Sequence, residues 1–482
     1  MRSAIRGLLC CCLLASFAAS AQADVLLYKY RRGRAIVLQG KVTINPGKTV
    51  TFKHPEFSDP LYFALDQIEH YKAPTIQEQF LKRLGPAKRA NNANELFEVG
   101  IWALKHGLLT EFYEIVNDTL ALEPGHARAL NVLSMREKIK RKLPEPTQQE
   151  AEMRALVKRA DMKIDTSEHF ILMHDTPDKP KEGHKKKRSA ERLELLEKVY
   201  ESFLLLFFAN GVQLEIPTEK LKVVLFNEYK DFKDFSVALN PSLASAAGFW
   251  DERNNTAIFF DYSSREELKE ILEIAGEMEE QANDMIRSKD PRAGTIKRFA
   301  KTLNLIGLIQ QENGDVEVVS HECTHQMAGN TGLLPKGVRI PSWVHEGLAT
   351  YFEAPADASW SGIGAVNERR LSLYKVLEPL AKIDMLVGDQ NFDFAGNHIA
   401  VEHGYSQAWS MTHFLMETRF HKLFEFYRVL GEMPRDLELS PKVLNALFTR
   451  CIGDMKEIEQ EWRRYMRAQK TDLDKILDKE KL

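Results

Sequence analysis

The chain has 482 residues, with 66 lysines and arginines against 69 aspartates and glutamates, and a formal net charge of −3 at pH 7. This length is enough for two or three domains. The near balance of charge argues against a nucleic-acid-binding protein, because such proteins carry a basic surface that neutralises phosphates. The one basic run, 179–188, is interpreted as a solvated loop, with contact to an anionic surface or substrate as the alternative.

The first 23 residues have the pattern of a secretory signal peptide. Arg2 and Arg6 precede a short apolar run over 7–19, and Ala21-Gln22-Ala23 fits the small-x-small rule for signal peptidase. The apolar run is too short for a transmembrane helix, which needs about 20 residues. We therefore expect cleavage before Asp24 and an exported protein, periplasmic or extracellular, with no integral membrane segment after cleavage.

The next part of the chain is predicted to contain two small units before the main domain. Residues 24–90 are predicted to form a small β module, because apolar and polar residues alternate over 35–44 and a turn follows at 45–48. Residues 91–143 are predicted to be helical and resemble a tetratricopeptide unit, although a solenoid normally needs three or more units. We expect a helical hairpin that packs on a neighbour or binds a protein partner. Residues 144–161 are interpreted as a linker.

Residues 162–482 are predicted to form one α+β domain, with a small mixed sheet and a largely helical C-terminal half. Apolar runs at 170–174 and 221–226 predict strands, and 190–208 has the period of an amphipathic helix. Asn254-Asn255 lies between two apolar runs and predicts a hairpin.

An HExxH motif, formed by His321, Glu322 and His325, carries most of the predicted chemistry. On a helix, histidines four residues apart lie one turn apart on the same face, with Cβ atoms about 5–6 Å from each other. This separation suits two imidazoles on one zinc ion. Glu322 adjoins the first histidine, so it can reach a metal-bound water instead of the metal. The alternative is a helix with two surface histidines.

A second acidic motif follows within a loop and a return helix, over 343–353, with Ser342 as the predicted N-cap of that helix. HExxH followed by Trp-x-x-Glu-Gly-Leu-Ala-x-Tyr resembles the gluzincin zinc metallopeptidases. The chain also resembles a family of uncharacterised, secreted bacterial gluzincin-like proteins that carry a tetratricopeptide-like N-terminal region. The resemblance runs from about residue 162 to the C-terminus. It implies one catalytic zinc ion with Glu346 as the third ligand.

The resemblance also marks two positions near the third ligand. In the thermolysin branch, an Asp lies four residues after the Glu ligand and supports a histidine ligand. Thr350 occupies that position here. The hydrogen-bond partners of the ligands must therefore differ, and Glu353 is the candidate replacement. His345 adjoins Glu346 and points at least a quarter turn away on a helix, so it is not expected to be a ligand. The run 276–280 resembles an aminopeptidase substrate motif but lacks its Asn, and is interpreted as a solvated helix face.

The predicted function is that of a zinc-dependent metallopeptidase acting on peptides or proteins. Zinc would lower the pKa of a bound water to about 7. Glu322 would take a proton from that water and pass it to the leaving amine. Tyr405 is the candidate donor to the oxyanion, with His403 as the competitor and a packed tyrosine at a helix start as the alternative. Two rival functions stay open, a degenerate metallopeptidase fold that acts as a binding scaffold and a zinc hydrolase that cleaves cell-wall amides.

The two cysteines beyond the signal segment are Cys323 and Cys451, so the mature chain is not a disulfide scaffold. Cys323 lies two residues after His321, roughly on the opposite face of the predicted helix. It is interpreted as a small buried residue, and a Cys323–Cys451 bridge is the alternative.

Overall fold

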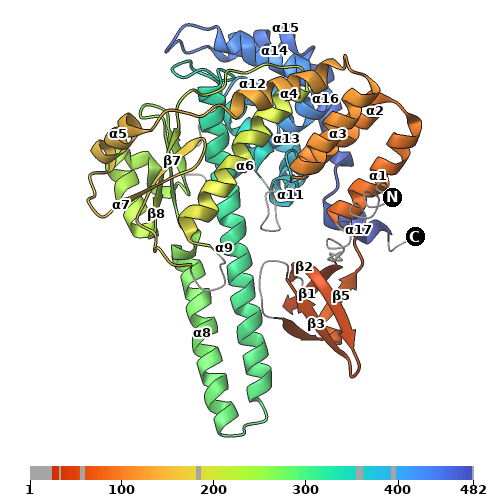
Figure 1. The fold of residues 1–482 in the computed structure, drawn as a ribbon, viewed down its shortest axis with the longest axis vertical. Helices are drawn as coiled ribbons and strands as arrows, with labels where there is room; N and C mark the ends of the chain where they lie inside the picture. The colour runs from red at the N-terminus through yellow and green to blue at the C-terminus, as the bar shows by residue number, and fades with distance from the viewer. Residues whose placement is uncertain are drawn as a thin grey trace, which may run out of the picture.

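The computed structural model describes residues 24–31, 34–54, 60–180, 186–353, 362–391 and 398–479 (Figure 1). In these parts the chain forms seventeen α-helices and two five-stranded sheets, which confirms the predicted α+β class. The predicted signal segment, 1–23, lies outside the described residues. None of the described helices combines the length and the apolar character that a bilayer span requires.

The N-terminal sheet has the strand order β4-β3-β2-β1-β5, and all its neighbouring strands are antiparallel. Its strands are β1 (Asp24–Arg31), β2 (Arg34–Asn45), β3 (Thr49–Lys53), β4 (Leu61–Ala64) and β5 (Ile68–Tyr71). The predicted turn after Asn45 is confirmed, with Gly47 and Lys48 at positive φ. The apolar face of this sheet packs on Leu305 of the long helix α9 (Ala293–Asn330).

The predicted β module is wrong in its last part, because residues from Ile76 to Ala90 form helix α1. Thr75 and Glu78 make a capping box, in which each side chain accepts a hydrogen bond from the other residue's backbone N–H. This arrangement satisfies two free donors at the start of the helix. Helix α1 therefore belongs with the helical region that follows.

The helical region comprises α1, α2 (Ala93–Lys105), α3 (Leu109–Leu122) and α4 (Ala127–Ile139). It packs against α6 (Arg188–Ala209), and its core is continuous with that of the following domain. Phe97 and Phe112 belong to the same buried cluster as Phe203 and Phe207 of α6. The prediction that the helical hairpin packs on a neighbour is confirmed, and the hairpin is extended to four helices.

The predicted linker contains helix α5 (Thr147–Val157). Its side chains Met153 and Val157 are buried with Ile171 and Val224 of the central sheet. The prolines near 145 mark the start of a packed helix and not an extended connection, because Pro146 occupies the N-cap position. The linker prediction is therefore wrong, and α5 covers one face of the central sheet.

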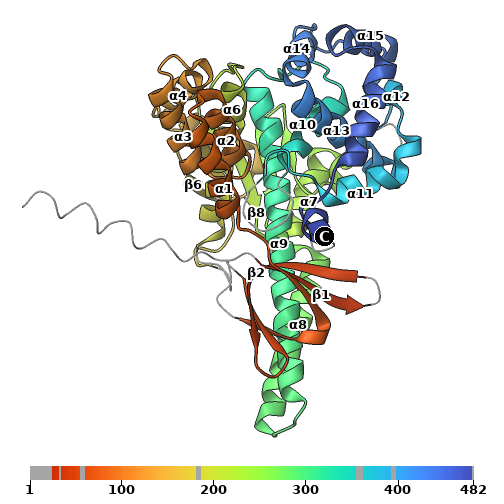
Figure 2. The same ribbon diagram turned by 90° about the vertical axis from the view of Figure 1, so that its right-hand side faces the viewer.

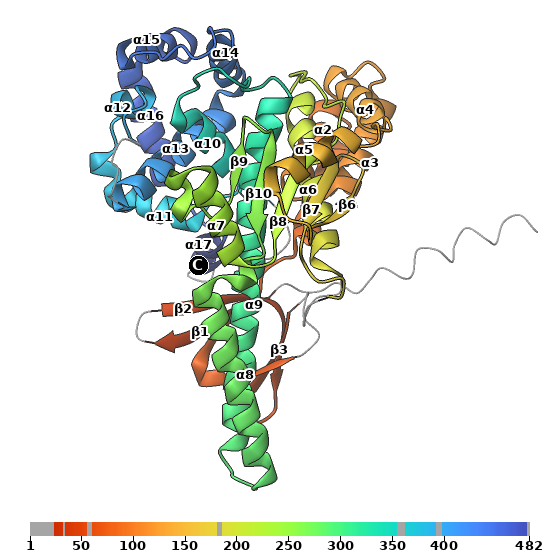
Figure 3. The same cartoon turned by 90° about the vertical axis from the view of Figure 1, so that its left-hand side faces the viewer.

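The central sheet has the strand order β6-β7-β8-β10-β9. Its strands are β6 (Lys163–Thr166), β7 (Phe170–His174), β8 (Leu221–Phe226), β9 (Phe249–Asp251) and β10 (Thr256–Phe260). Strands β7, β8 and β10 are parallel and buried throughout, since helices lie on both faces of the sheet (Figure 3). The predicted strands and hairpin are confirmed, with β9 as the antiparallel edge strand.

The rest of the domain is mostly helical, as predicted. Helices α8 and α9 form a long antiparallel hairpin that projects from the body, and the C-terminal half of α9 runs into the core (Figures 1 and 2). The run 276–280 lies within α8, as expected for a helix face. The remaining helices are α7 (Tyr229–Leu239), α8 (Glu266–Arg287), α10 (Ser342–Phe352), α11 (Glu368–Leu377), α12 (Ile383–Val387), α13 (His398–Thr418), α14 (Phe420–Gly431), α15 (Pro441–Cys451), α16 (Met455–Ala468) and α17 (Asp472–Lys479), with short 3₁₀ turns at Leu65–Gln67, Pro241–Ser245, Tyr262–Ser264 and Glu378–Leu380.

Candidate metal centre

Helices α9 and α10 carry the two predicted zinc motifs and lie against each other. The predicted N-cap of α10 is wrong, because Ser342 is its first helical residue and Pro341 holds the cap position. The backbone N–H of Ser342 donates to Oδ1 of Asp389 at 2.7 Å, and its hydroxyl lies 3.2 Å from Oδ2. A carboxylate from a distant segment thus satisfies a free donor at the start of α10.

Two glycines allow neighbouring elements to approach the motif-bearing helices closely. A Cβ on Gly347 would lie 2.8 Å from the backbone oxygen of Ala408, so α10 touches α13 directly at this point. A Cβ on Gly248 would lie 2.5 Å from Cγ1 of Val318, so the start of β9 touches α9. These contacts place α13 and the edge strand on two sides of the predicted ligands.

The three predicted ligands converge. Nε2 of His321 lies 3.1 Å from Nε2 of His325 and 3.1 Å from Oε2 of Glu346, and the third edge of this triangle is 3.7 Å. In a tetrahedral zinc site with ligand bonds of about 2.0–2.1 Å, ligand atoms lie about 3.3 Å apart. The three atoms therefore fit one zinc ion, and His₂Glu is a donor set that catalytic zinc uses.

The three ligand side chains keep a route to solvent. His321, His325 and Glu346 have exposed fractions of 13%, 12% and 22%. His345 lies outside the cluster of converging ligand atoms, as expected, although its ring centroid is 5.9 Å from that of His325. Burial lowers the pKa of His345 to about 4, so this ring is neutral at physiological pH. The exposed part of the three ligand side chains is where a water would reach a bound metal ion.

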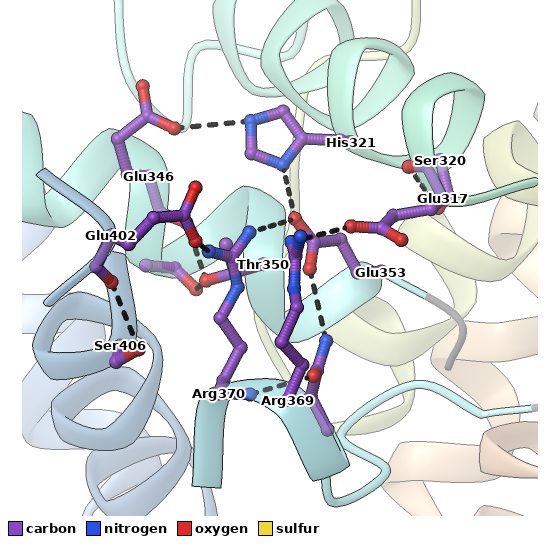
Figure 4. A network of polar contacts seen from close by, with 12 residues as sticks. Glu317, Ser320, His321, Glu346, Thr350, Glu353, Arg369, Arg370, Glu402 and Ser406 are labelled. Carbon is purple, nitrogen blue, oxygen red and sulfur yellow. Dashed lines mark hydrogen bonds and ion pairs between the residues drawn. The ribbon is translucent and has the colours of Figure 1, made fainter. Parts of the chain in front are cut away.

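Glu353 takes the place of the missing Asp. Its Oε1 lies 2.8 Å from Nδ1 of His321, which fixes the ring so that Nε2 faces the metal position (Figure 4). The amide of Asn367 and the guanidinium of Arg370 each donate to Glu353 at 3.2 Å. Thr350 instead donates to the backbone oxygen of Glu346 at 2.6 Å. The structure therefore supports the predicted replacement by Glu353.

The charges at the centre favour ionised carboxylates. Burial raises the pKa of Glu346, but the nearby His325 and the hydrogen bond with His321 outweigh burial and hold that pKa far below its usual value. Burial also raises the pKa of Glu353, and Arg370 together with His321 brings it below its usual value. Both groups are therefore anions at neutral pH, as a metal ligand and its supporting acceptor need to be.

Glu322 has the environment of a proton acceptor near the metal position. Burial raises its pKa above the usual value, and the neighbouring His321 and His325 oppose this shift. A backbone hydrogen bond from Trp250 on β9 also reaches its carboxylate. The direction of this shift suits a carboxylate that has to take up a proton and release it again. The predicted base therefore lies on the ligand helix α9, beside the edge strand β9.

Carboxylates of the centre influence the pKa of Tyr405 but not that of His403. The negative charge of Glu346 is the largest influence that raises the pKa of Tyr405, followed by burial and the charge of Glu322. Burial alone lowers the pKa of His403, whose Nδ1 lies 3.3 Å from the amide nitrogen of Gln407. The prediction that Tyr405 begins a helix is wrong, because α13 starts at His398. The influence of these carboxylates favours Tyr405 over His403 as the candidate donor.

A buried charge cluster anchors α9 ahead of the motif. Asp315 lies on α9 and forms ion pairs with Arg188 and Arg192 of α6, the second at 2.7 Å. Arg188 also lies 3.1 Å from Asp261, and the side chains of Arg188, Asp261 and Asp315 are almost fully buried. Breaking a buried pair by removing one partner costs about 3–5 kcal/mol. The cluster therefore fixes the rotation of α9 about its axis, and its position along that axis, relative to α6.

Several residues that hold the centre were not predicted from the sequence. Asp315, Arg370 and Asp389 form no motif with regular spacing, and each acts on a partner that is distant in the chain. The only local signal was that Asp315 is a charged residue just before an apolar run. Cys323 is buried as predicted. Both Cys323 and Cys451 are free, so the alternative of a bridge between them is wrong.

The comparisons with known proteins add one finding. A family model described as "Protein of unknown function (DUF1570)" matches residues 315–435. This span contains the three converging ligands together with Glu322 and Tyr405. No curated protein and no solved structure matches the chain.

Proposed function

We propose that the protein is an exported zinc metallopeptidase that hydrolyses peptide bonds. The observation that carries this proposal is the convergence of His321, His325 and Glu346 on a position that one zinc ion would fill. The ligands keep partial exposure, and Glu322 is adjacent to the first of them. A purely structural zinc site is normally closed by four protein ligands.

Each side chain around the centre has a role in this proposal. A zinc ion bound there would supply a Lewis acid that polarises a carbonyl and acidifies water. Glu322 takes the proton of the attacking water and delivers it to the leaving nitrogen, in keeping with its raised pKa. Tyr405 donates a hydrogen bond to the carbonyl oxygen as negative charge develops there. Glu353 holds the ring of His321 in its binding orientation.

The substrate in this proposal is an extended peptide paired with β9. Within the described residues, this strand is the outermost of the central sheet and pairs with β10 on one side only. The backbone of its residue Trp250 lies beside Glu322. A peptide added as a further strand gains backbone hydrogen bonds without dependence on its sequence. The face of α1–α4 that does not pack on α6 stays a proposed surface for a protein partner.

The Glu322→Gln variant tests the proposal. Removal of the proton acceptor is expected to lower kcat on a mixed peptide library by about 10²–10⁴-fold, while zinc content stays that of the wild type. Glu277→Gln on the exposed part of α8 is the matched control and is expected to keep full activity. Wild-type protein that is loaded with zinc and cleaves no peptide would contradict the proposal, as would full turnover by Glu322→Gln.

A further inference from the structure

The start of α11 joins the helices that build the metal centre. Arg370 donates to Glu353 at the end of α10 at 3.2 Å and to Glu402 of α13 at 3.4 Å (Figure 4). Arg369, its neighbour, donates to Glu317 of α9 at 2.9 Å. One short helix therefore contacts the helices that carry the histidine ligands, the glutamate ligand and Tyr405.

The two arginines differ in burial. The side chains of Arg370 and Glu353 have exposed fractions of 6% and 3%, whereas that of Arg369 is 59% exposed. An exposed ion pair contributes about 0–1 kcal/mol, because solvent screens it. A buried charge that loses its partner costs several times as much. The pair between Arg370 and Glu353 is therefore the one that fixes side-chain positions.

Arg370 acts on both halves of the centre. On one side it and His321 both contact Oε1 of Glu353, so this oxygen stays aimed at the imidazole. On the other side its Cζ lies 5.1 Å from the centroid of the Tyr405 ring, within the range of a cation–π contact. Arginine reaches the two carboxylates through two separate nitrogens of its planar fork, whereas a lysine offers a single nitrogen.

We propose that Arg370 is a positioning residue that sets the orientation of His321, through Glu353, together with that of Tyr405. The part that concerns Tyr405 rests on the proposed function. The part that concerns His321 requires only that the centre binds zinc. Arg370 thus couples the metal affinity of the centre to the position of the Tyr405 side chain, although it touches neither the metal position nor a converging ligand.

The experiment compares Arg370→Met and Arg370→Lys with Arg369→Met as the matched control. Zinc affinity is measured by competition with a chromophoric chelator, and kcat and KM are measured at saturating zinc. Arg370→Met is expected to weaken zinc binding about 10–100-fold, as loss of a ligand's supporting partners does. It is also expected to lower kcat with little change in KM. Arg370→Lys should recover only part of either loss, and Arg369→Met should stay within about threefold of wild type.

A further variant, Glu402→Gln, separates the two halves and guards against misfolding. It keeps the pair between Arg370 and Glu353, so zinc affinity should hold within about threefold. It weakens the contact between Arg370 and Glu402 on the helix that carries Tyr405, so kcat should fall. Zinc affinities of Arg370→Met and Arg370→Lys equal to that of Arg369→Met would overturn the inference, even if their melting temperatures fall. If the affinities shift as expected but the wild type cleaves no peptide, the proposed function fails and the inference about His321 stands.

Discussion

Replacing Gly347 by alanine would force α10 away from α13. The new Cβ would lie 2.1 Å from Oγ1 of Thr412 and 2.8 Å from the backbone oxygen of Ala408, whereas non-bonded heavy atoms prefer about 3.5–4.0 Å. Thr412 can rotate its side chain, but the oxygen of Ala408 is part of the helix. The helices must therefore separate by more than half an ångström, roughly, to restore contact distance.

This separation has two measurable effects. Overpacking of a tight contact costs about 1–3 kcal/mol, so the denaturant midpoint of Gly347→Ala should fall. Glu346 is the preceding residue, and metal-site geometry needs to hold within about 0.5 Å, so zinc affinity should fall by on the order of tenfold.

Gly276→Ala is the matched control. Gly276 lies in α8 with nothing within 4 Å of an added Cβ, so alanine there should add about 0.5–1 kcal/mol of stability and leave zinc affinity unchanged. The reasoning is refuted if Gly347→Ala keeps the wild-type midpoint and zinc affinity.

Three further predictions follow from the site and its surroundings. Tyr405→Phe should lower kcat about 10²–10³-fold with KM nearly unchanged, while His403→Gln keeps the wild-type kcat. If steady-state assays show equal losses of kcat in the two variants, the assignment of Tyr405 as the oxyanion donor is refuted. His169 and Glu197 form a partly buried pair. Burial lowers the pKa of His169, but Glu197 outweighs burial and raises that pKa above 6.5. Burial raises the pKa of Glu197, but His169 outweighs burial and brings that pKa below 4.5. The pair should therefore stabilise the fold most between pH 4.5 and 6.5, and the melting-temperature deficit of His169→Gln should shrink as pH rises through the folded pKa of His169. Burial lowers the pKa of His321, but its hydrogen bonds with Glu346 and Glu353 hold it well above 6.5 before metal binds, so zinc binding at pH 7 should release a proton from this ring. Calorimetry in two buffers of different ionisation enthalpy measures the released proton. Zinc binding without proton release would contradict this prediction.

The parts of the fold that the sequence predicted are those with a strong local pattern. Strands β7 and β8 are apolar runs buried on both faces, and the β9–β10 hairpin has its turn at Asn254-Asn255. The histidines of the ligand set are one helical turn apart, so a single element fixes their geometry. Local spacing was sufficient for these features because few distant contacts decide them.

The parts that the sequence analysis missed depend on signals that were misinterpreted or on distant contacts. The capping box of Thr75 and Glu78 was a readable sign of α1, and Pro146 was a readable sign of α5. Nothing local could show that Asp389 meets the start of α10 or that Arg370 meets Glu353, because those contacts arise only when separate helices pack. The orientation of the ligands therefore required the structure.

Metal analysis of purified protein tests the central claim most directly. After incubation with zinc and removal of the excess, the wild type should retain about one zinc ion per chain, and Glu346→Gln and His325→Ala should lose most of it at the same chelator concentration. Wild-type protein that retains no stoichiometric zinc would contradict the account, and so would a Glu346→Gln variant with wild-type zinc affinity.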